Sequence, residues 1–167
     1  DWPLPQMQYT PYYIQADGTL GPELPETSDP TRYTFDPSDP VPTIGGGISA
    51  ANEVMVAGAF DQRGAKRFYG SKDTLPLSAR SDVLVFQTPE LEEDVEVTGP
   101  LTVNLWASSS AVDTDFTVKL IDVHPPNADF PDGFCQNISD SIIRARYRDS
   151  RDRPELMDPG EIYPFEI

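Results

Sequence analysis

Proline and glycine interrupt this chain so often that long helices are not expected. The 167 residues include 18 prolines and 11 glycines, spread along most of the sequence. Proline fixes φ and lacks the N–H that a helix interior requires, so a helix ends or kinks where proline occurs. The sequence therefore favours short strands joined by loops.

The second half of the chain alternates apolar and polar residues with a period of two. Three runs place apolar residues on one strand face: Leu101, Val103, Leu105 and Ala107; Phe116, Val118 and Leu120; Ile143, Ala145 and Tyr147. Shorter apolar runs at residues 83–88 and 95–97 also predict strands. Short strands separated by Gly, Pro, Ser and Asp clusters are typical of an antiparallel sandwich or barrel.

The first 42 residues have a different composition. Proline recurs throughout them, often directly after aspartate, as at Asp36-Pro37 and Asp39-Pro40. Each Asp-Pro pair favours a turn in an extended chain. We therefore expect residues 1–42 to be an extended linker with one short strand near residues 9–14, and residues 43–167 to be the sandwich domain.

The chain is strongly acidic, with 28 Asp plus Glu against 12 Lys plus Arg and a formal charge of −16. Such a charge repels phosphate backbones and anionic membranes, so neither nucleic acid nor membrane is an expected partner. No apolar run approaches the roughly 20 residues needed to span a bilayer. We expect a soluble chain, and the cytoplasm is the favoured compartment although the sequence does not fix it.

The residues of a hydrolase active site are not found together in this sequence. A serine hydrolase usually carries its nucleophile on a G-x-S-x-G turn, and the chain contains none. The single histidine, His124, precedes two prolines and is expected to be a turn residue. We therefore predict no catalytic residue, cofactor or metal in this chain.

The acidic residues between 113 and 132 allow two interpretations. Asn127, Asp129 and Asp132 loosely resemble a calcium loop, but their spacing departs from the alternating pattern and the terminal Glu is missing. The alternative is structural: Asp113 and Asp115 bond turn amides or pair across strands with Arg144 and Arg146. We expect the structural interpretation and leave calcium open.

Several longer motifs resemble one known family in the family's own order. They are YTFDPSDPVPTIGG (33–46), DQR (61–63), SSSAVDTDF (108–116), the segment 112–147 that begins VDTDFTVKLIDV, and PGEIYPFEI (159–167). Together they resemble the C-terminal domain of the X-Pro dipeptidyl-peptidase, cocaine-esterase and glutaryl-acylase group of serine hydrolases. The resemblance covers nearly the whole chain.

The resemblance implies a fold and a partner. The fold would be a jelly-roll-like β-sandwich of the galactose-binding type, and the partner an upstream α/β-hydrolase domain that carries the Ser-His-Asp triad. The family's later strands, with a motif of the type H-R-I-x-L-x-I-S-S-S-N-F-P, have no match here. We therefore expect a sandwich incomplete at its C-terminal end, with an exposed strand edge through which a homodimer could form.

The resemblance also implies roles for particular residues. The segment after the Gly-Gly pair would line the cleft of the hydrolase domain, with candidates Ile48, Val54, Met55, Val56 and Phe60. The residues Asp61, Gln62 and Arg63 would fix this loop by hydrogen bonds, and Asp113, Asp115 and Asp122 belong to the family's structural motif.

Three functions remain open from the sequence. The first is an accessory domain of a serine hydrolase that cleaves esters, amides or X-Pro dipeptides, inactive without its catalytic domain. The second is a free-standing module that binds carbohydrate or peptide through aromatic residues: Trp2, Tyr9, Tyr12, Tyr13 and Trp106. The third is a purely structural or oligomerisation domain.

Overall fold

The computed structural model describes residues 4–27, 29–44, 61–63 and 76–167. The chain divides into two compact units, residues 1–99 and residues 100–167. Each unit is described by itself. The boundary that the sequence suggests between residues 42 and 43 stays a prediction.

The first unit contains a small hairpin and one 3-10 turn. Strands β1 (Tyr13–Ile14) and β2 (Leu20–Gly21) pair antiparallel, and η1 spans Leu77–Ala79. The hairpin turn needs glycine, because Gly18 has a φ of +88° and its neighbour Asp17 accepts hydrogen bonds from the Thr19 amide and hydroxyl. The strand β1 lies within the range where the sequence suggests a short strand.

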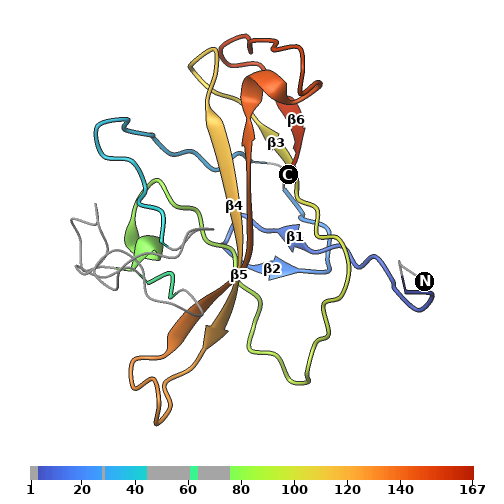
Figure 1. Cartoon of the computed structure of the whole chain (residues 1–167), viewed down its shortest axis with the longest axis vertical. Helices are drawn as coiled ribbons and strands as arrows, with labels where there is room; N and C mark the ends of the chain where they lie inside the picture. Colours follow the sequence, from blue (N-terminus) through green and yellow to red (C-terminus); the bar gives the residue numbers. More distant parts are fainter. Residues whose placement is uncertain (1–3, 28, 45–60, 64–75) are drawn as a thin grey trace. The chain divides into compact units, whose positions relative to one another are not determined.

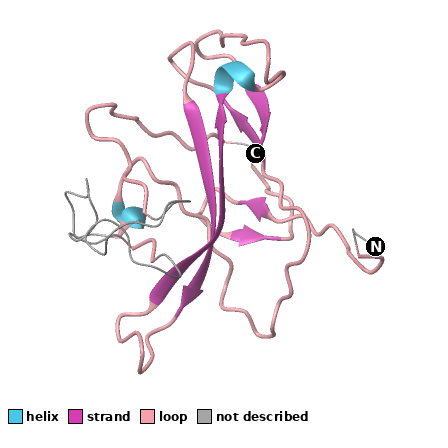
Figure 2. Cartoon of the chain, in the orientation of Figure 1, coloured by secondary structure: helices cyan, strands magenta, loops and turns pink. Residues whose placement is uncertain are grey.

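The second unit is built from two antiparallel pairs of strands. Strand β3 (Asn104–Ala107) pairs with β6 (Tyr163–Glu166). The longer strands β4 (Asp115–His124) and β5 (Phe134–Arg144) pair with each other, and the 3-10 turn η2 (Ala145–Tyr147) follows β5 (Figures 1 and 2).

The two strand pairs of this unit pack on a common core. Its centre is Ala145, Met157 and Phe165, and around it lie Leu105, Ala107, Phe116, Ile143, Tyr163 and Ile167. The rings of Phe116 on β4 and Phe165 on β6 have centroids 4.8 Å apart. Because side chains from both pairs meet in one core, the arrangement is that of a β-sandwich. The predicted all-β class is confirmed.

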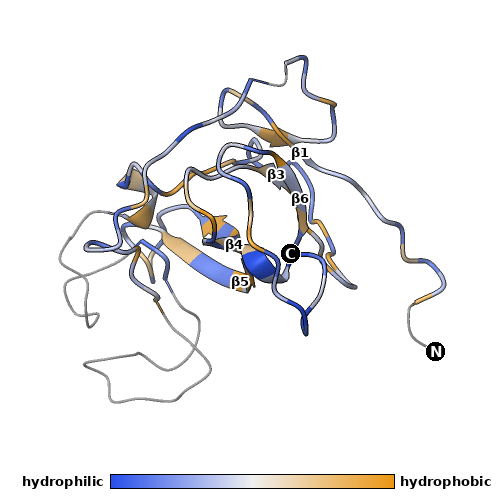
Figure 3. Ribbon diagram, turned by 90° about the horizontal axis from the view of Figure 1, so that it is seen from above, coloured by the Kyte–Doolittle hydropathy of each residue, from blue (hydrophilic) through white to orange (hydrophobic). Residues whose placement is uncertain are grey.

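The period-two pattern predicts the inner face only where this core lies. Leu105, Phe116 and Ile143 face the core as expected, but Leu120 and Tyr147 are exposed. Leu120 lies beyond the core, beside a register shift where Ile138 of β5 has no opposite residue. Tyr147 does not face the core because β5 ends at Arg144. In the 3-10 turn that follows, side chains repeat every three residues instead of every two. In Figure 3 the colouring of β5 changes between apolar and polar along its length.

Two predicted strands are not formed. Residues 83–88 contain only an isolated bridge from Gln87 to Thr19, and residues 95–97 are coil. A run of β-branched residues becomes a strand only when a second strand completes its hydrogen bonds, and no ladder within the described residues does so here. Leu84, Val85, Val95 and Val97 are accordingly exposed.

No helix among the described residues has the length and apolar character needed to cross a membrane.

Removing the central aromatic side chain should destabilise the chain strongly. Phe165 is 2% exposed, so Phe165→Ala should cost about 3–5 kcal/mol of unfolding free energy through lost burial and a residual cavity. The matched control is Ile142→Ala on β5, which is 62% exposed and should cost at most about 1 kcal/mol. Urea titration followed by circular dichroism measures both. Equal losses would show that the core lies elsewhere.

Candidate functional site

Two buried residues flank the segment that the sequence assigns to a substrate cleft. Ile44 is 1% exposed and Gln62 is 4% exposed. The Gln62 side-chain amide donates a hydrogen bond to the Ile44 carbonyl over 3.2 Å. Ile44 and Gln62, on either side of positions 45–60 in the sequence, are therefore joined at a buried contact. The candidates Ile48, Val54, Met55, Val56 and Phe60 themselves lie outside the described residues.

The two residues on either side of Gln62 pair with each other. The Asp61 carboxylate accepts hydrogen bonds from the Arg63 amide over 3.1 Å and from its Nε over 2.8 Å. The structure therefore joins Asp61 to Arg63 and Gln62 to Ile44, and the role of the DQR motif in fixing a loop stays a prediction.

A second segment begins at the same base. The Leu77 amide donates to the Arg63 carbonyl over 3.0 Å, so Arg63 and Leu77, which lie close to the two sides of positions 64–75 in the sequence, are neighbours. Since Gln62 and Arg63 are adjacent in sequence, the base of segment 45–60 adjoins the base of segment 64–75. We call these joined contacts, formed by Ile44, residues 61–63 and Leu77, the loop base.

Arg80 attaches the proline-rich segment beside this loop base. Its guanidinium forms two hydrogen bonds of 2.8 Å with Asp82 and one of 2.7 Å with the Asp39 carbonyl. The hydrogen bond from Arg80 is the main cause that lowers the pKa of Asp82. Burial, and then the charge of Asp82, raises the pKa of Tyr33. Arg80 was not singled out by the sequence, although an Arg and an Asp two residues apart repeat the spacing of Asp61 and Arg63.

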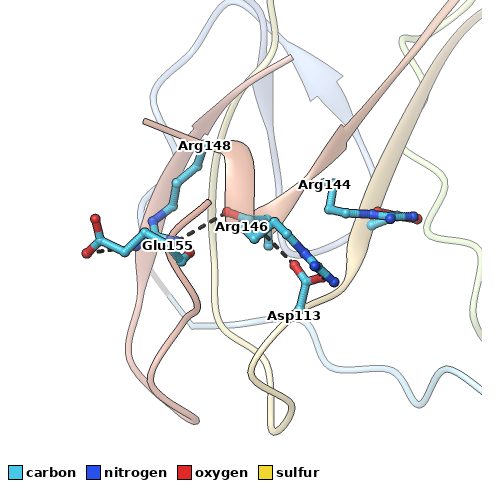
Figure 4. A network of polar contacts seen from close by, with 7 residues as sticks. Asp113, Arg144, Arg146, Arg148 and Glu155 are labelled. Atoms are coloured by element: carbon cyan, nitrogen blue, oxygen red, sulfur yellow. Dashed lines mark hydrogen bonds and ion pairs between the residues drawn. The ribbon is translucent and has the colours of Figure 1, made fainter. Parts of the chain in front are cut away.

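The second unit contains the cluster of arginines that follows β5 (Figure 4). Asp113 accepts hydrogen bonds from the Arg146 amide over 2.9 Å and from its Nε over 2.6 Å. Asp115 receives two bonds, of 2.8 and 3.0 Å, from Arg144, its cross-strand partner. Both structural alternatives are thus found, since Asp113 and Asp115 pair with Arg146 and Arg144 and Asp113 also bonds the Arg146 amide. These contacts join the residues around the start of β4 to those around the end of β5.

Asp113 is held in its ionised form. Its burial alone would raise its pKa, but the hydrogen bonds and charge of Arg146, with a further contribution from the charge of Arg144, lower the pKa below its ordinary value. Asp113 is also the less exposed partner, since its side chain is 15% exposed against 38% for Arg146. The pair therefore behaves as a structural clamp.

Arg148 is the most deeply placed cation of this cluster, with a side chain only 4% exposed. Its Nη1 donates to the carbonyls of Ala145 over 3.2 Å and Glu155 over 2.6 Å. Its guanidinium lies 4.3 Å from the centre of the Tyr163 ring. The sequence gives no sign of this burial, because the carbonyl of Glu155 reaches Arg148 only after the chain folds back.

His124 and Asp122 meet at the far end of β4. His124 Nε2 lies 3.1 Å from Asp122 Oδ2, and the His124 ring lies beside Phe134. The turn opposite needs glycine: Gly133 has a φ of +76°, and a Cβ there would lie 2.7 Å from the His124 carbonyl. Asp122 is thus the partner of His124, and the two lie close to a tight turn.

The loop between β4 and β5 satisfies its own polar groups. The Asn127 side-chain oxygen accepts hydrogen bonds of 2.9 Å from the amides of both Asp129 and Phe130. The Asn127 side-chain oxygen is thereby engaged in a turn. In the ranges that the structure describes, no three His, Cys, Asp or Glu side chains gather as metal ligands.

Comparison of the sequence identifies a family along its full length. Residues 1–167 match the family described as the X-Pro dipeptidyl-peptidase C-terminal non-catalytic domain. The chain is 40% identical over 176 residues to the cocaine esterase of Rhodococcus sp. (strain MB1 Bresler). This match covers 100% of the chain and 27% of the esterase.

Two solved structures share the fold. One is a selenomethionine-labelled α-amino acid ester hydrolase, with a TM-score of 0.75 and 31% identity, covering 95% of this chain and 25% of that one. The other is an aminopeptidase from the marine sediment archaeon Thaumarchaeota archaeon, with a TM-score of 0.78 and 31% identity, covering 100% of this chain and 27% of that one. The chain therefore spans about a quarter of the length of the relatives it matches.

Neutralising Asp113 should remove a pH-dependent part of the stability. Its pKa is lowered in the folded chain, so its contribution is fully present above the unfolded pKa of about 4 and is lost as pH falls through the lower folded value. Asp113→Asn should cost about 1–2 kcal/mol at pH 7, a range reduced because Arg146 is partly screened by solvent.

The measurement is the melting temperature between pH 7 and pH 2. The difference between Asp113→Asn and the unmodified chain should shrink below about pH 4. Asp115→Asn is the matched control, because its pair with Arg144 is more exposed. A constant difference across this pH range for Asp113→Asn would contradict the clamp.

Proposed function

Because the chain belongs to the family of X-Pro dipeptidyl-peptidase C-terminal non-catalytic domains, we propose that it is the accessory domain of a larger serine hydrolase. The parent enzyme hydrolyses esters, amides or X-Pro dipeptides by acyl transfer to water. The catalytic triad comes from an upstream α/β-hydrolase domain of the same polypeptide. The accessory domain forms one wall of the active-site cleft and stabilises the catalytic domain.

One observation carries this proposal. The family match runs through all 167 residues, and its description is of a non-catalytic domain. The similarity to cocaine esterase likewise spans the whole chain while covering 27% of the esterase. The whole chain thus matches about a quarter of a hydrolase, which is the size of one domain.

The chemistry of the described residues agrees with a triad supplied by another domain. The single histidine of the sequence lies on β4 with its Nε2 directed at the Asp122 carboxylate. In a Ser-His-Asp triad this nitrogen receives the proton of the serine, and the carboxylate contacts the other one. The polar clusters around Asp113 and Arg148 hold strands and turns together, which is the work of a scaffold.

The loop base supports the assignment of segment 45–60 to the cleft wall. A binding loop needs a rigid support, because its side chains must be held near the productive geometry. Three contacts supply that support: the hydrogen bond between Gln62 and Ile44, the ion pair of Asp61 and Arg63, and the hydrogen bond from Arg80 to the Asp39 carbonyl. The segment itself contains mainly glycine, alanine and apolar residues, as a pocket for an acyl group requires.

A second candidate function, binding of carbohydrate, is favoured by Trp106. This side chain is 68% exposed on β3, and an exposed indole on a sheet can stack on a sugar ring. Quenching of tryptophan fluorescence by added oligosaccharides, lost in Trp106→Ala, would favour this second function over the first.

The purified chain should have no hydrolase activity of its own. Its single histidine, the usual base for a nucleophile, is directed at the Asp122 carboxylate instead. Assays with p-nitrophenyl acetate and with an X-Pro p-nitroanilide should give the rate of buffer alone. Turnover that a serine-directed inhibitor abolishes, in a preparation free of other hydrolases, would refute the non-catalytic role.

A charge in the candidate cleft wall should reduce catalysis by the parent enzyme. Met55→Asp would bury an unpaired carboxylate against the hydrolase domain, which costs several kcal/mol unless the carboxylate is protonated. We expect kcat/KM to fall at least about 100-fold, which corresponds to about 3 kcal/mol of transition-state stabilisation.

The same substitution in the isolated chain is the control. There it should leave the melting temperature unchanged, because the partner surface is absent. Leu105→Asp should instead unfold the isolated chain, since Leu105 packs against the core. If Met55→Asp unfolds the isolated chain as severely as Leu105→Asp, segment 45–60 belongs to the core and not to the cleft.

A further inference from the structure

Arg80 binds a segment that lies far from it in the sequence. Its guanidinium donates a hydrogen bond of 2.7 Å to the Asp39 carbonyl, 41 residues away, while two bonds of 2.8 Å hold it against the Asp82 carboxylate. The Arg80 and Asp82 side chains are only 16% and 7% exposed. A guanidinium held bidentately by a carboxylate has a fixed direction, so its remaining N–H groups fix the position of the carbonyl that they contact.

The chain between Asp39 and Ile44 is stiff. Pro40 and Pro42 have a φ fixed by their rings, and the residue before each of them is restricted to extended conformations. Asp39 also ends a turn, because its amide donates to the Asp36 carbonyl over 3.0 Å. A displacement of Asp39 is therefore passed along this segment to Ile44, because little main-chain rotation is available to absorb it.

Both ends of this stiff segment are attached to one support. The Gln62 side chain donates to the Ile44 carbonyl over 3.2 Å, and Arg80 donates to the Asp39 carbonyl. Arg80 directly follows η1, and the first amide of η1 donates to the Arg63 carbonyl of the loop base. The segment is therefore fixed at two points, by side chains that the loop base and η1 connect to each other.

Arg144 shows what is particular to Arg80. It also contacts one carboxylate bidentately, through bonds of 2.8 and 3.0 Å to Asp115. Its side chain is 53% exposed, and it joins two strands that a ladder already holds in register. The segment that Arg80 holds, residues 39–44, belongs to no helix or strand. Its position therefore depends on side-chain contacts such as that of Arg80.

We propose that Arg80 is a positioning residue for the hydrolysis that the parent enzyme catalyses. It acts through the Asp39 carbonyl and the two prolines on Ile44, which precedes the candidate cleft wall in the sequence. This role rests on the proposed function, because the cleft wall is assigned there. The wall of an acyl pocket contacts a long acyl chain over more of its length than a short one, so displacing the wall changes selectivity for acyl length.

The selectivity of the parent enzyme for acyl length tests this role. Arg80→Gln should lower the ratio of kcat/KM for p-nitrophenyl hexanoate to that for p-nitrophenyl acetate at least about fivefold. A purely structural role leaves this ratio unchanged, because a loss of folded enzyme lowers both values of kcat/KM by the same factor. An unchanged ratio in Arg80→Gln would overturn the proposal.

Arg144→Gln is the matched control, since it also removes a bidentate arginine from a carboxylate. It should lower the melting temperature of the parent slightly and leave the selectivity ratio unchanged. If Arg144→Gln lowers the ratio as much as Arg80→Gln does, general loosening of the domain changes the selectivity, and the proposal is wrong.

Pro42→Gly tests the route and leaves the contacts of Arg80 in place. Glycine restores rotation of the main chain, so the selectivity ratio should fall in the same direction as in Arg80→Gln. In the double variant, the fall should be no greater than in the more severe single variant, because both changes interrupt one path. An unchanged ratio in Pro42→Gly, or additive effects in the double variant, would contradict this route.

Failure of the proposed function gives a different result. If Met55→Asp lowers kcat/KM of the parent while Arg80→Gln leaves the selectivity ratio unchanged, the cleft wall is supported and only the role of Arg80 is overturned. If neither substitution changes catalysis, both the cleft wall and the role of Arg80 are overturned.

Discussion

The second unit depends on the buried guanidinium of Arg148. This group joins three parts of the chain that are separate in sequence: the turn after β5 through the Ala145 carbonyl, the returning segment through Glu155, and β6 through the ring of Tyr163. A buried charge is tolerated only when its hydrogen bonds are satisfied, and here carbonyls, carboxylates and an aromatic face do so together. The same contacts position Met157 and Phe165 over Ala145, so the core forms where Arg148 fixes the return of the chain.

The few basic side chains of this acidic chain form structural ion pairs. Within the described residues, these side chains each pair with a carboxylate: Arg63, Arg80, Lys119, Arg144, Arg146 and Arg148. These ion pairs lie at or near the loop base, along β4 and β5, and in the turn that follows β5. The excess carboxylates remain at the surface and keep the chain highly charged.

The proposed function needs rigidity at a distance from the reacting groups. The loop base holds the residues on either side of the candidate cleft segment, because Ile44 and Gln62 are buried and joined by a hydrogen bond. The polar clusters of the second unit keep its strands in register. A non-catalytic domain contributes to a hydrolase in these ways: it holds a surface in place and supplies no proton or nucleophile.

The sequence by itself determined the all-β class and the inner face of β3. It offered the pairing of Asp113 and Asp115 with Arg144 and Arg146 as one of two structural alternatives. These follow from local rules, because alternation sets the face of a strand and opposite charges at neighbouring strand ends attract. The family motifs also placed Asp61, Gln62 and Arg63 at a loop. Only the tertiary structure decided that residues 83–88 lack a ladder, that Leu120 lies beyond the core and that Arg148 is buried. Each of these depends on which distant segment lies alongside, and a strand partner or a buried cation's acceptor is not encoded in the neighbouring residues.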